Sequence, residues 1–419
     1  MQILAPKNIE NLILSWNTES SPNLALTSAW TVPSFSGKCP VKLGKNWMEY
    51  QGIKNWEGLL DPLDDNLRGE IIRYGHFVEA AYRACNFDPS SPSYAMCRYS
   101  KKKLLQLSGF PGTGYRVSKY LKATSGIKLP SWVNNAPKWM AKQSSWIGYV
   151  AVCHDQREIE RLGRRDVVIA LRGTATCLEW LENLRATLTP VPNNEYDRPK
   201  NLKCCSSICN PNNCCPMVES GFLSLYTSKI GARQSLQDMV REEITRIQKA
   251  YPGQSLSFTI AGHSLGAALA TLTAYDVKQA FNEIPLVTVI SFGGPRVGNQ
   301  SFRYHLDKQG TKILRIVNSD DLITKVPGFV IDNNSDNSME KSGHWIQKLV
   351  KDTQWVYADV GCELRLSSSN SPYLNGINIA ACHELNTYLQ LVNGFVSSSC
   401  PVRATAKKMM RKGNNVKST

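Results

Sequence analysis

Apolar residues recur in two different patterns along the chain, and the change falls near residue 145. Within residues 43–99, which favour helix, the stretch 67–85 repeats apolar side chains at helical spacing and predicts an amphipathic helix. Beyond residue 145, short apolar runs alternate with amphipathic stretches. Near-continuous apolar strands alternating with helices are typical of a mostly parallel sheet covered on both faces, so we predict one α/β core.

The individual elements of this core follow from the apolar runs. Strands are predicted at residues 146–152, 167–171, 257–260, 286–292 and 313–317. Helices are predicted at residues 178–188, 235–250, 267–281 and 384–392. Glycine and proline dominate the stretch 108–143, which we interpret as an irregular surface segment.

These patterns divide the chain into four parts. Residues 1–42 form an N-terminal segment, disordered or part of a transit peptide, and residues 43–145 form a helical and irregular region that packs on the core. Residues 146–400 form the α/β domain, and residues 401–419 form a basic tail. The first 20 residues lack the basic and apolar regions of a secretory signal, so we expect no export by that route.

Composition excludes several classes of protein. Because 42% of the 419 residues are hydrophobic and 20% are charged, a disordered or fibrous chain is excluded. The longest apolar runs are far shorter than the roughly 20 residues that a membrane-spanning helix needs. No nucleic-acid-binding signature accompanies the net charge of +15, so we expect no nucleic-acid partner and instead a peripheral contact with an anionic membrane surface.

The most informative motif is Gly-His-Ser-Leu-Gly at residues 262–266, between the apolar strand 257–260 and a helix rich in small residues. It matches the nucleophile elbow of α/β-hydrolases, in which Ser264 would occupy a strained turn with its hydroxyl exposed. Gly262 and Gly266 are expected there because a Cβ at either position would collide with the neighbouring strand or helix. The motif therefore predicts a serine nucleophile on an α/β-hydrolase fold.

A serine nucleophile needs a general base, which in α/β-hydrolases follows the acid in the chain. His383 comes just before the predicted helix 384–392, after a late loop, and is our candidate for the base. His344, in a polar segment, and His305, in a charged stretch, remain alternatives. His263 adjoins the nucleophile on a sharp turn, and we interpret it as a packed, hydrogen-bonded histidine.

The acid and the oxyanion hole are expected at the ends of strands. The strand 313–317 runs into Asn-Ser-Asp-Asp, and geometry alone leaves both Asp320 and Asp321 open. An oxyanion hole needs two preorganised N–H donors, one from the residue after the nucleophile and one from a loop after an earlier strand. Leu265 supplies the first, and the second is expected from the Arg-Gly-Thr sequence that ends at Thr174.

Four motifs in order make the sequence recognisable. They are Ile-Ala-Leu-Arg-Gly-Thr at 169–174, Gly-His-Ser-Leu-Gly at 262–266, Phe-Gly-Gly-Pro-Arg-Val-Gly at 292–298, and Arg-Ile-Val-Asn at 315–318 followed by Asp321. Together they resemble the class 3, fungal-lipase-like family. With the lead-in at 47–64, the chain from about residue 43 to 401 resembles the plant class I phospholipase A1 group, the acylhydrolases similar to the defective-in-anther-dehiscence protein.

The resemblance implies a triad of Ser264, His383 and Asp321, with Thr174 at the family's oxyanion position. It implies hydrolysis of acyl esters of membrane glycerolipids, phosphatidylcholine and plastid galactolipids among them, typically at the sn-1 position, without a metal or another cofactor. A triacylglycerol lipase is the alternative activity, and a catalytically silent lipase-like scaffold is the alternative of another class. Members of the group are usually plastid proteins, so a chloroplast location is expected, with the cytoplasm as the alternative.

A cysteine-rich insertion at about 189–217 lies where class 3 lipases carry a lid over the serine. Its vicinal cysteine pairs lack the spacing that zinc prefers, so no metal site is expected. We interpret the insertion either as a variable surface loop or as a redox-sensitive or lipid-modified lid. Its cysteines are Cys204, Cys205, Cys209, Cys214 and Cys215.

Overall fold

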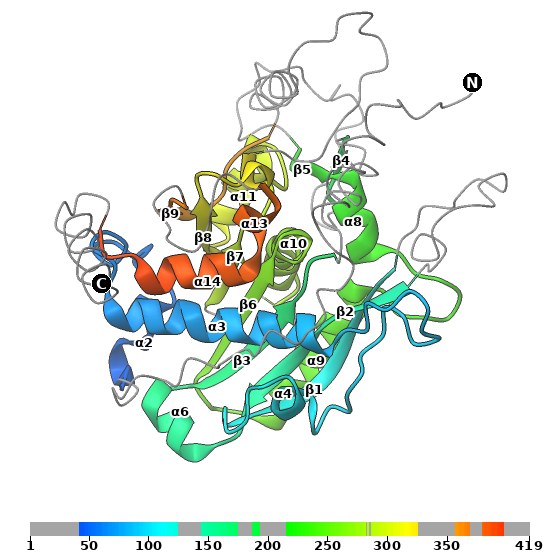
Figure 1. Ribbon diagram of the computed structural model, residues 1–419, viewed down its shortest axis with the longest axis horizontal. Coiled ribbons are helices and arrows are strands. Elements are labelled where there is room, and N and C mark those ends of the chain that lie inside the picture. Colours follow the sequence, from blue (N-terminus) through cyan, green and yellow to red (C-terminus); the bar gives the residue numbers. More distant parts are fainter. Residues whose placement is uncertain are drawn as a thin grey trace, which may run out of the picture. The chain divides into compact units, whose positions relative to one another are not determined.

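A mixed sheet with the strand order β1-β2-β3-β6-β7-β8-β9 runs through the described part of the protein (Figure 1). The computed structural model describes residues 42–124, 144–174, 187–192, 215–281, 283–284, 286–325, 357–368 and 379–397. The strands of this sheet are β1 (Tyr115–Thr124), β2 (Ser144–Cys153), β3 (Arg165–Leu171), β6 (Leu256–His263), β7 (Val287–Phe292), β8 (Lys312–Asn318) and β9 (Cys362–Leu366). A separate antiparallel pair consists of β4 (Leu188–Pro190) and β5 (Met217–Glu219).

Most of the sheet is parallel. Strands β3, β6, β7, β8 and β9 pair in parallel, whereas β1 and β2 extend the sheet by antiparallel pairing at the β3 edge. The predicted α/β fold with a mostly parallel sheet is therefore confirmed. The five predicted strands correspond to β2, β3, β6, β7 and β8.

Several elements differ from the sequence-based expectation, and strands β1, β4, β5 and β9 were not predicted. β1 lies inside the stretch 108–143, so the interpretation of that stretch as irregular is wrong for residues 115–124. β9 was not expected at all. β1 and β9 are the two edge strands of the sheet, and each mixes buried and exposed residues. An edge strand has a neighbouring strand on one side only, so it stays partly exposed and lacks the continuous apolar run by which the central strands were predicted. Of the predicted helix at 178–188, residues 178–186 lie outside the described part, and Leu188 begins β4.

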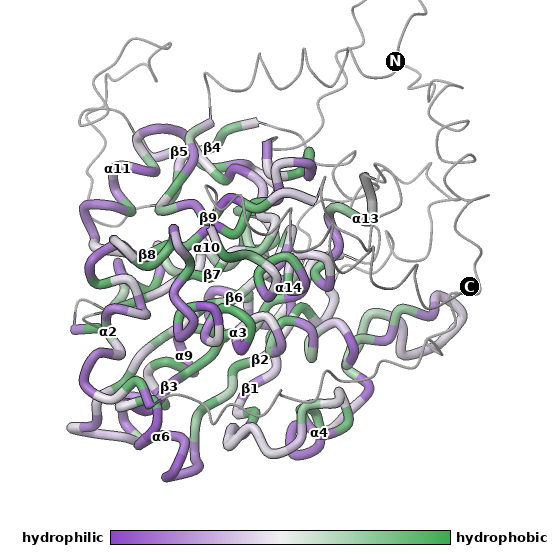
Figure 2. The backbone as a smooth tube through the Cα atoms, turned by 60° about the vertical axis from the view of Figure 1, so that its left-hand side comes forward, coloured by the Kyte–Doolittle hydropathy of each residue, from purple (hydrophilic) through white to green (hydrophobic). Residues whose placement is uncertain are grey.

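Helices cover both faces of the sheet. Successive side chains of β3 point to opposite faces and are buried on both, so each face needs a cover. Val167 and Ile169 pack with α8, α9, α10 and α11, whereas Val168 and Ala170 pack with α2, α3, α4 and α14. Figure 2 shows hydrophobic residues gathered along the central β6, β7 and α10. The helices are α2 (Trp47–Tyr50), α3 (Asp65–Ala84), α4 (Leu104–Leu107), α6 (Gln156–Leu162), α8 (Ser220–Thr227), α9 (Leu236–Ala250), α10 (Leu265–Ala280), α11 (Gln300–Lys308), α13 (Ile379–His383) and α14 (Leu385–Gly394), with the 3₁₀ turns η1 (Gly44–Asn46) and η2 (Leu322–Lys325).

Helix α3 begins at a capped N-terminus. The carboxylate of Asp64 accepts hydrogen bonds from the amides of Asn66 and Leu67 at 2.8 and 3.0 Å, which satisfies two of the N–H groups that a helix leaves without partners at its start. The predicted helix at 67–85 is thus present, with its start two residues earlier.

Helices α3 and α14 lie side by side across one face of the sheet (Figure 1). Their close approach depends on Gly75, where a Cβ would collide with the side chain of Leu389. The seam is also polar, because Arg68 Nη1 donates to the carbonyl of Val392 at 2.5 Å across a separation of 324 residues. The first long helix and the last helix of the described chain are therefore direct neighbours.

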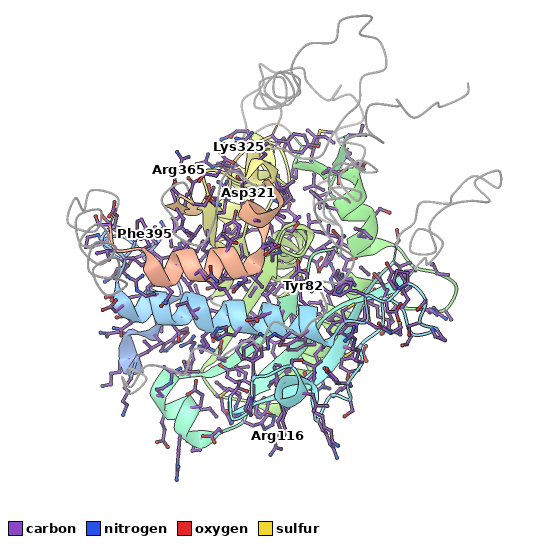
Figure 3. The ribbon with its side chains drawn as sticks, in the orientation of Figure 1. Tyr82, Arg116, Asp321, Lys325, Arg365 and Phe395 are labelled. Atoms are coloured by element: carbon purple, nitrogen blue, oxygen red, sulfur yellow. The ribbon has the colours of Figure 1, made fainter. Side chains whose placement is uncertain are left out.

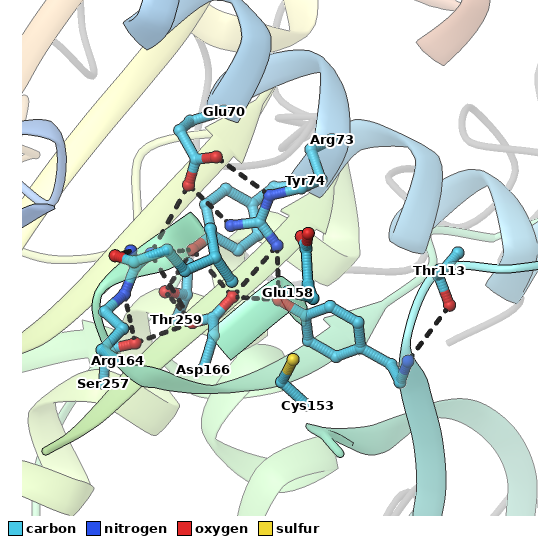
Figure 4. Close-up of polar contacts among 12 residues, drawn as sticks. Glu70, Arg73, Tyr74, Thr113, Cys153, Glu158, Arg164, Asp166, Ser257 and Thr259 are labelled. Carbon is cyan, nitrogen blue, oxygen red and sulfur yellow. Dashed lines mark hydrogen bonds and ion pairs between the residues drawn. The ribbon is translucent and has the colours of Figure 1, made fainter. Parts of the chain in front are cut away.

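A buried cluster of charged and hydroxyl groups fastens α3 to the sheet (Figure 4). On α3, Arg73 pairs with Glu70 at 2.6 Å, and it reaches Asp166 of β3 at 3.1 Å. Arg164 approaches Glu70 at 3.4 Å, and its side chain is completely buried. Asp166 also accepts from the Ser257 hydroxyl at 2.7 Å. Two carboxylates thus face two guanidinium groups in the interior.

Ionisation inside this cluster is a balance of two opposing effects. Burial disfavours the charged carboxylate of Asp166, but Arg164 and Arg73 outweigh it and hold the pKa of Asp166 below its ordinary value. The same balance holds for Glu70: burial disfavours its charged form, but Arg73 and Arg164 together outweigh burial and lower its pKa. Breaking such a pair is costly, since the remaining buried charge loses its partner.

We expect Asp166→Asn to lower the free energy of unfolding at neutral pH by about 3 kcal/mol, because both guanidinium groups lose a compensating charge. Urea unfolding followed by circular dichroism measures this loss. Glu242→Gln is the matched control, since it makes the same change in the exposed Lys119–Glu242 pair and should cost little. Equal losses in the two variants would contradict a stabilising role for the buried cluster.

Another buried carboxylate, Glu219, has no ion-pair partner among the described residues. It lies at the end of β5 and caps α8, where one of its oxygens accepts from the Phe222 amide at 2.7 Å. Its other oxygen, Oε1, has no hydrogen-bond partner among the residues that the structure describes. Burial raises the pKa of Glu219 to about 7, because the charged form is poorly solvated there.

This raised pKa gives stability a definite pH dependence. The folded state binds the proton of Glu219 more tightly than the unfolded state, whose pKa is near 4.5, so its stabilising contribution is lost as pH rises from about 4.5 to about 7. Glu219→Gln keeps an oxygen for the Phe222 amide and removes the charge. We expect it to be about 3 kcal/mol more stable than wild type above pH 8 and equal near pH 4.5, as urea unfolding across pH would measure. If the free energies of unfolding of wild type and variant differed by the same amount at every pH, this expectation would be refuted.

Candidate active site

The turn between β6 and α10 holds Ser264 in a strained conformation. Its backbone dihedrals are φ 57° and ψ −125°, in a region that residues with a side chain rarely adopt. The amide of Ser264 donates to the Phe292 carbonyl at 3.0 Å, which ties the turn to β7. Strain of this kind persists where the surrounding structure fixes it, and it concentrates at functional positions.

The two glycines of the motif have the contacts that a close strand–helix approach requires. A Cβ on Gly262 would collide with the carbonyl oxygen of Gly266, and a Cβ on Gly266 would collide with the carbonyl oxygen of Leu171. Because these neighbours are backbone atoms, no side-chain movement could relieve the collision. Larger residues at either position would therefore displace Ser264.

His383 and Asp321 come from different elements and meet in the interior. His383 is the last residue of α13, and its Nδ1 lies 2.6 Å from Oδ2 of Asp321, which follows β8. Asp321 is fully buried, and its Oδ1 accepts from the Ile323 amide at 2.9 Å. Since the carboxylate lies at Nδ1, that nitrogen carries the proton and Nε2 is left as the basic nitrogen of the ring.

The neighbouring Asp320 faces elsewhere. Its Oδ2 accepts from the amide and the hydroxyl of Ser368 at 2.8 and 2.7 Å, so it stabilises the loop after β9. Their position after the predicted strand left both aspartates as candidates for the acid. The structure brings Asp321, not Asp320, to His383. Figure 3 labels Asp321 near α13.

Tyr388 is a further contact of Asp321 that the sequence did not indicate. Its hydroxyl donates to the same Oδ2 at 2.6 Å, and it accepts from the Asn318 amide at 3.2 Å. The side chain is completely buried. An apolar helix position was the sole signal for Tyr388 in the sequence, and such a signal predicts packing rather than a hydrogen bond to the acid.

The loop after β3 lies next to the nucleophile. β3 and β6 pair in parallel up to Leu171 and Gly262, so the residues that follow each strand emerge side by side. A Cβ on Gly173 would lie 3.0 Å from the Cβ of Ser264. The Thr174 hydroxyl is buried and has no hydrogen-bond partner among the described residues. Leu265 is the first residue of α10, and amides at the start of a helix have no carbonyl partner within it.

His263 is buried and hydrogen-bonded on both ring nitrogens. Its Nδ1 lies 2.7 Å from the Tyr82 hydroxyl, and its Nε2 lies 2.7 Å from the carbonyl oxygen of His383. Burial, together with the nearby His383, lowers the pKa of His263 well below its ordinary value, so the ring is neutral at physiological pH.

Other predicted residues lie away from this cluster or outside the described part. His305 is on α11, where its ring contacts Tyr304. His344 and residues 193–214 of the insertion, with Cys204, Cys205, Cys209 and Cys214, lie outside the described residues, as do residues 1–41 and 398–419. Cys215 is described and is exposed.

The described residues contain neither a cluster of metal ligands nor a membrane-spanning helix. No group of three or more His, Cys, Asp or Glu side chains in this part is arranged to hold a metal ion. No described helix has the length and apolar character needed to cross a bilayer.

Comparisons with known proteins agree with the motifs. The lipase (class 3) family model matches residues 168–331. The chain is 63% identical over 377 residues to the Arabidopsis thaliana protein named phospholipase A(1) DAD1, chloroplastic. This match covers 89% of this chain and 82% of that relative. It is 39% identical over 368 residues to galactolipase DONGLE, chloroplastic, also from Arabidopsis thaliana, with 84% of this chain and 71% of the relative covered.

Among solved structures, the chain is similar to the native Rhizomucor miehei lipase propeptide complex, at 15% identity, with 80% of this chain and 83% of that chain covered and a TM-score of 0.41. The fold assignment rests on the strand order and on the elbow between β6 and α10 described above. With a relative 63% identical over most of both chains, the protein belongs to the plant class I phospholipase A1 group of the class 3 lipase family.

Proposed function

We propose that this protein is a serine acylhydrolase that cleaves acyl esters of membrane glycerolipids, as a phospholipase A1 or galactolipase. The observation that carries the proposal is the 2.6 Å contact between His383 and Asp321, together with the strained Ser264 on its elbow. The names of the two Arabidopsis relatives, a phospholipase A1 and a galactolipase, support this class of substrate. No step needs a metal or another cofactor.

In the proposed mechanism, Nε2 of His383 takes the hydroxyl proton of Ser264 as its oxygen bonds to the ester carbonyl carbon. Asp321 orients the ring through Nδ1 and stabilises the imidazolium that forms. The N–H groups of Leu265 and Thr174 then hold the tetrahedral oxyanion. His383 returns the proton to the departing alcohol of the lysolipid, and water cleaves the acyl-enzyme by the same route.

The buried Thr174 hydroxyl supports the assignment of the oxyanion hole. A buried polar atom normally has a hydrogen-bond partner, and this hydroxyl has none among the described residues. An oxyanion formed on the carbonyl of a substrate bound to Ser264 would supply that partner. The hydroxyl would then contribute mainly when negative charge develops, which is where a donor accelerates the reaction.

We assign the sn-1 ester as the preferred bond and the chloroplast as the location. The relatives at 63% and 39% identity are both named chloroplastic, which supports the location. The net charge of +15 supports a peripheral contact with an anionic membrane surface. No observation favours triacylglycerol as the substrate, and a catalytically silent scaffold would not require the buried His383–Asp321 contact.

Incubation of purified wild type with phosphatidylcholine or monogalactosyldiacylglycerol dispersions should release fatty acid and 2-acyl lysolipid, as measured by mass spectrometry, with a triolein dispersion tested in parallel. Ser264→Ala should abolish that release because the acyl group has no nucleophile to attack it. A folded Ser264→Ala with the same near-ultraviolet circular dichroism spectrum is the control. Release from triolein alone would replace the proposal by a neutral-lipid lipase, and no turnover of any lipid would favour the scaffold.

Asp321→Asn should lower kcat by about 10³- to 10⁴-fold, because an amide no longer favours the Nδ1–H tautomer or stabilises the imidazolium. Asp320→Asn is the matched control, since it makes the same change one residue away in the bonds to Ser368 and should keep kcat within a few-fold. Steady-state kinetics on phosphatidylcholine measure both. If Asp320→Asn lost as much activity as Asp321→Asn, the assignment of the acid would be wrong.

A further inference from the structure

Tyr82, near the C-terminal end of α3, touches two parts of the proposed site at once (Figure 3). Its hydroxyl accepts the amide N–H of Gly173 at 2.8 Å, and it lies 2.7 Å from Nδ1 of His263. Nε2 of His263 in turn lies 2.7 Å from the carbonyl oxygen of His383. A line of hydrogen bonds therefore joins the loop before Thr174 to the backbone of the base.

The direction of each bond in this line follows from its two ends. A carbonyl oxygen can only accept, so Nε2 of His263 must carry a proton toward His383. Because the His263 ring is neutral, its Nδ1 has no proton and accepts from the Tyr82 hydroxyl. The hydroxyl proton is thereby donated to His263, and the Tyr82 oxygen accepts from the Gly173 amide. The donor and acceptor of every hydrogen bond are thereby assigned along the line that runs through Gly173, Tyr82, His263 and His383.

The Gly173 peptide groups are held from two sides. Tyr82 binds the N–H of Gly173, and Nη1 of Arg172 donates to its carbonyl at 2.6 Å. That carbonyl and the N–H of Thr174 belong to the same planar peptide and point in opposite directions. Fixing Gly173 therefore also fixes the direction of the Thr174 N–H, the proposed oxyanion donor.

We propose that Tyr82 is a positioning residue that sets the oxyanion loop and the backbone of the general base together. The proposal rests on the proposed acylhydrolase function for its effect on rate. It makes the catalytic site depend on α3, an element that precedes the 168–331 match to the lipase family model. Tyr82 acts through Thr174 and His383, and it is not assigned a contact with the substrate.

Tyr82→Phe removes one hydroxyl and keeps the ring. We expect the rate constant for modification of Ser264 by an alkyl fluorophosphonate to fall on the order of 10- to 100-fold, because a misplaced donor loses much of its effect on the transition state. This probe places a phosphonyl oxygen in the oxyanion hole and requires no lipid. On phosphatidylcholine, kcat should fall by a similar factor while KM changes by less than about twofold.

Tyr149→Phe is the matched control. The Tyr149 hydroxyl also bonds α3, through the Phe77 carbonyl at 2.8 Å, and the Tyr149 side chain is completely buried. Its removal loosens the same helix without touching Gly173 or His263. We expect Tyr149→Phe to lose about as much stability as Tyr82→Phe. Its rate constant for labelling of Ser264 should stay within about twofold of wild type. Equal labelling rates for Tyr82→Phe and Tyr149→Phe would overturn the proposal.

A further measurement separates positioning from a general structural effect. NMR of isotope-labelled histidine should show His263 as the neutral Nε2–H tautomer, and a change at Nδ1 in Tyr82→Phe; an Nδ1–H tautomer in wild type would also overturn the proposal.

The same measurements distinguish failure of this proposal from failure of the proposed function. Wild type that reacts with the fluorophosphonate but hydrolyses no glycerolipid contradicts the lipid substrate, and the labelling rates still decide the role of Tyr82. Wild type that hydrolyses glycerolipids while Tyr82→Phe labels at the wild-type rate contradicts the role of Tyr82 alone.

Discussion

The buried contact between the guanidinium groups of Arg73 and Arg164 and the carboxylate of Asp166 is the constraint on which the described structure depends. It fixes α3 against the start of β3, at the end of the sheet away from Ser264. Charges in the interior are stable only in one geometry, because any shift leaves a charge without its partner. Since a helix is stiff, fixing it at Arg73 also fixes its far end, where Tyr82 meets Gly173 and His263.

The proposed acid and base inherit their positions from the same packing. Helix α14 lies along α3, and its Tyr388 donates to Asp321, while His383 immediately precedes this helix. Asp321 therefore contacts both His383 at the end of α13 and Tyr388 on α14, and the Asn318 amide at the end of β8 donates to the same Tyr388 hydroxyl. Polar contacts that are fully satisfied in the interior favour a single arrangement over nearby alternatives. In this protein, that arrangement joins the helical lead-in, the sheet and the last described helix.

Much of the fold could be predicted from local sequence, whereas the finer parts of the site could not. Apolar runs located β2, β3, β6, β7 and β8, because strands covered on both faces carry continuous apolar residues. Edge strands β1 and β9 keep polar side chains, and they were missed. The spacing of Asp320 and Asp321 from β8 is nearly the same, so the local pattern alone does not separate them; the family resemblance implied Asp321, and in the structure it is Asp321 that lies against His383. Tyr82 and Tyr388 look like ordinary core residues in sequence, since a hydrogen bond between distant segments leaves no periodic signal.

The seam between α3 and α14 also has a consequence for how the protein is made. Arg68 and the Val392 carbonyl that it binds are 324 residues apart, so α14 leaves the ribosome long after α3. At a synthesis rate of about 5 to 20 residues per second, the side of α3 that faces α14 waits roughly 15 to 65 seconds for this partner. The proposed catalytic centre therefore cannot form until residues 383–392 have left the ribosome. In that interval the apolar residues on this side of α3 are open to chaperones, and the protein cannot yet hydrolyse lipid.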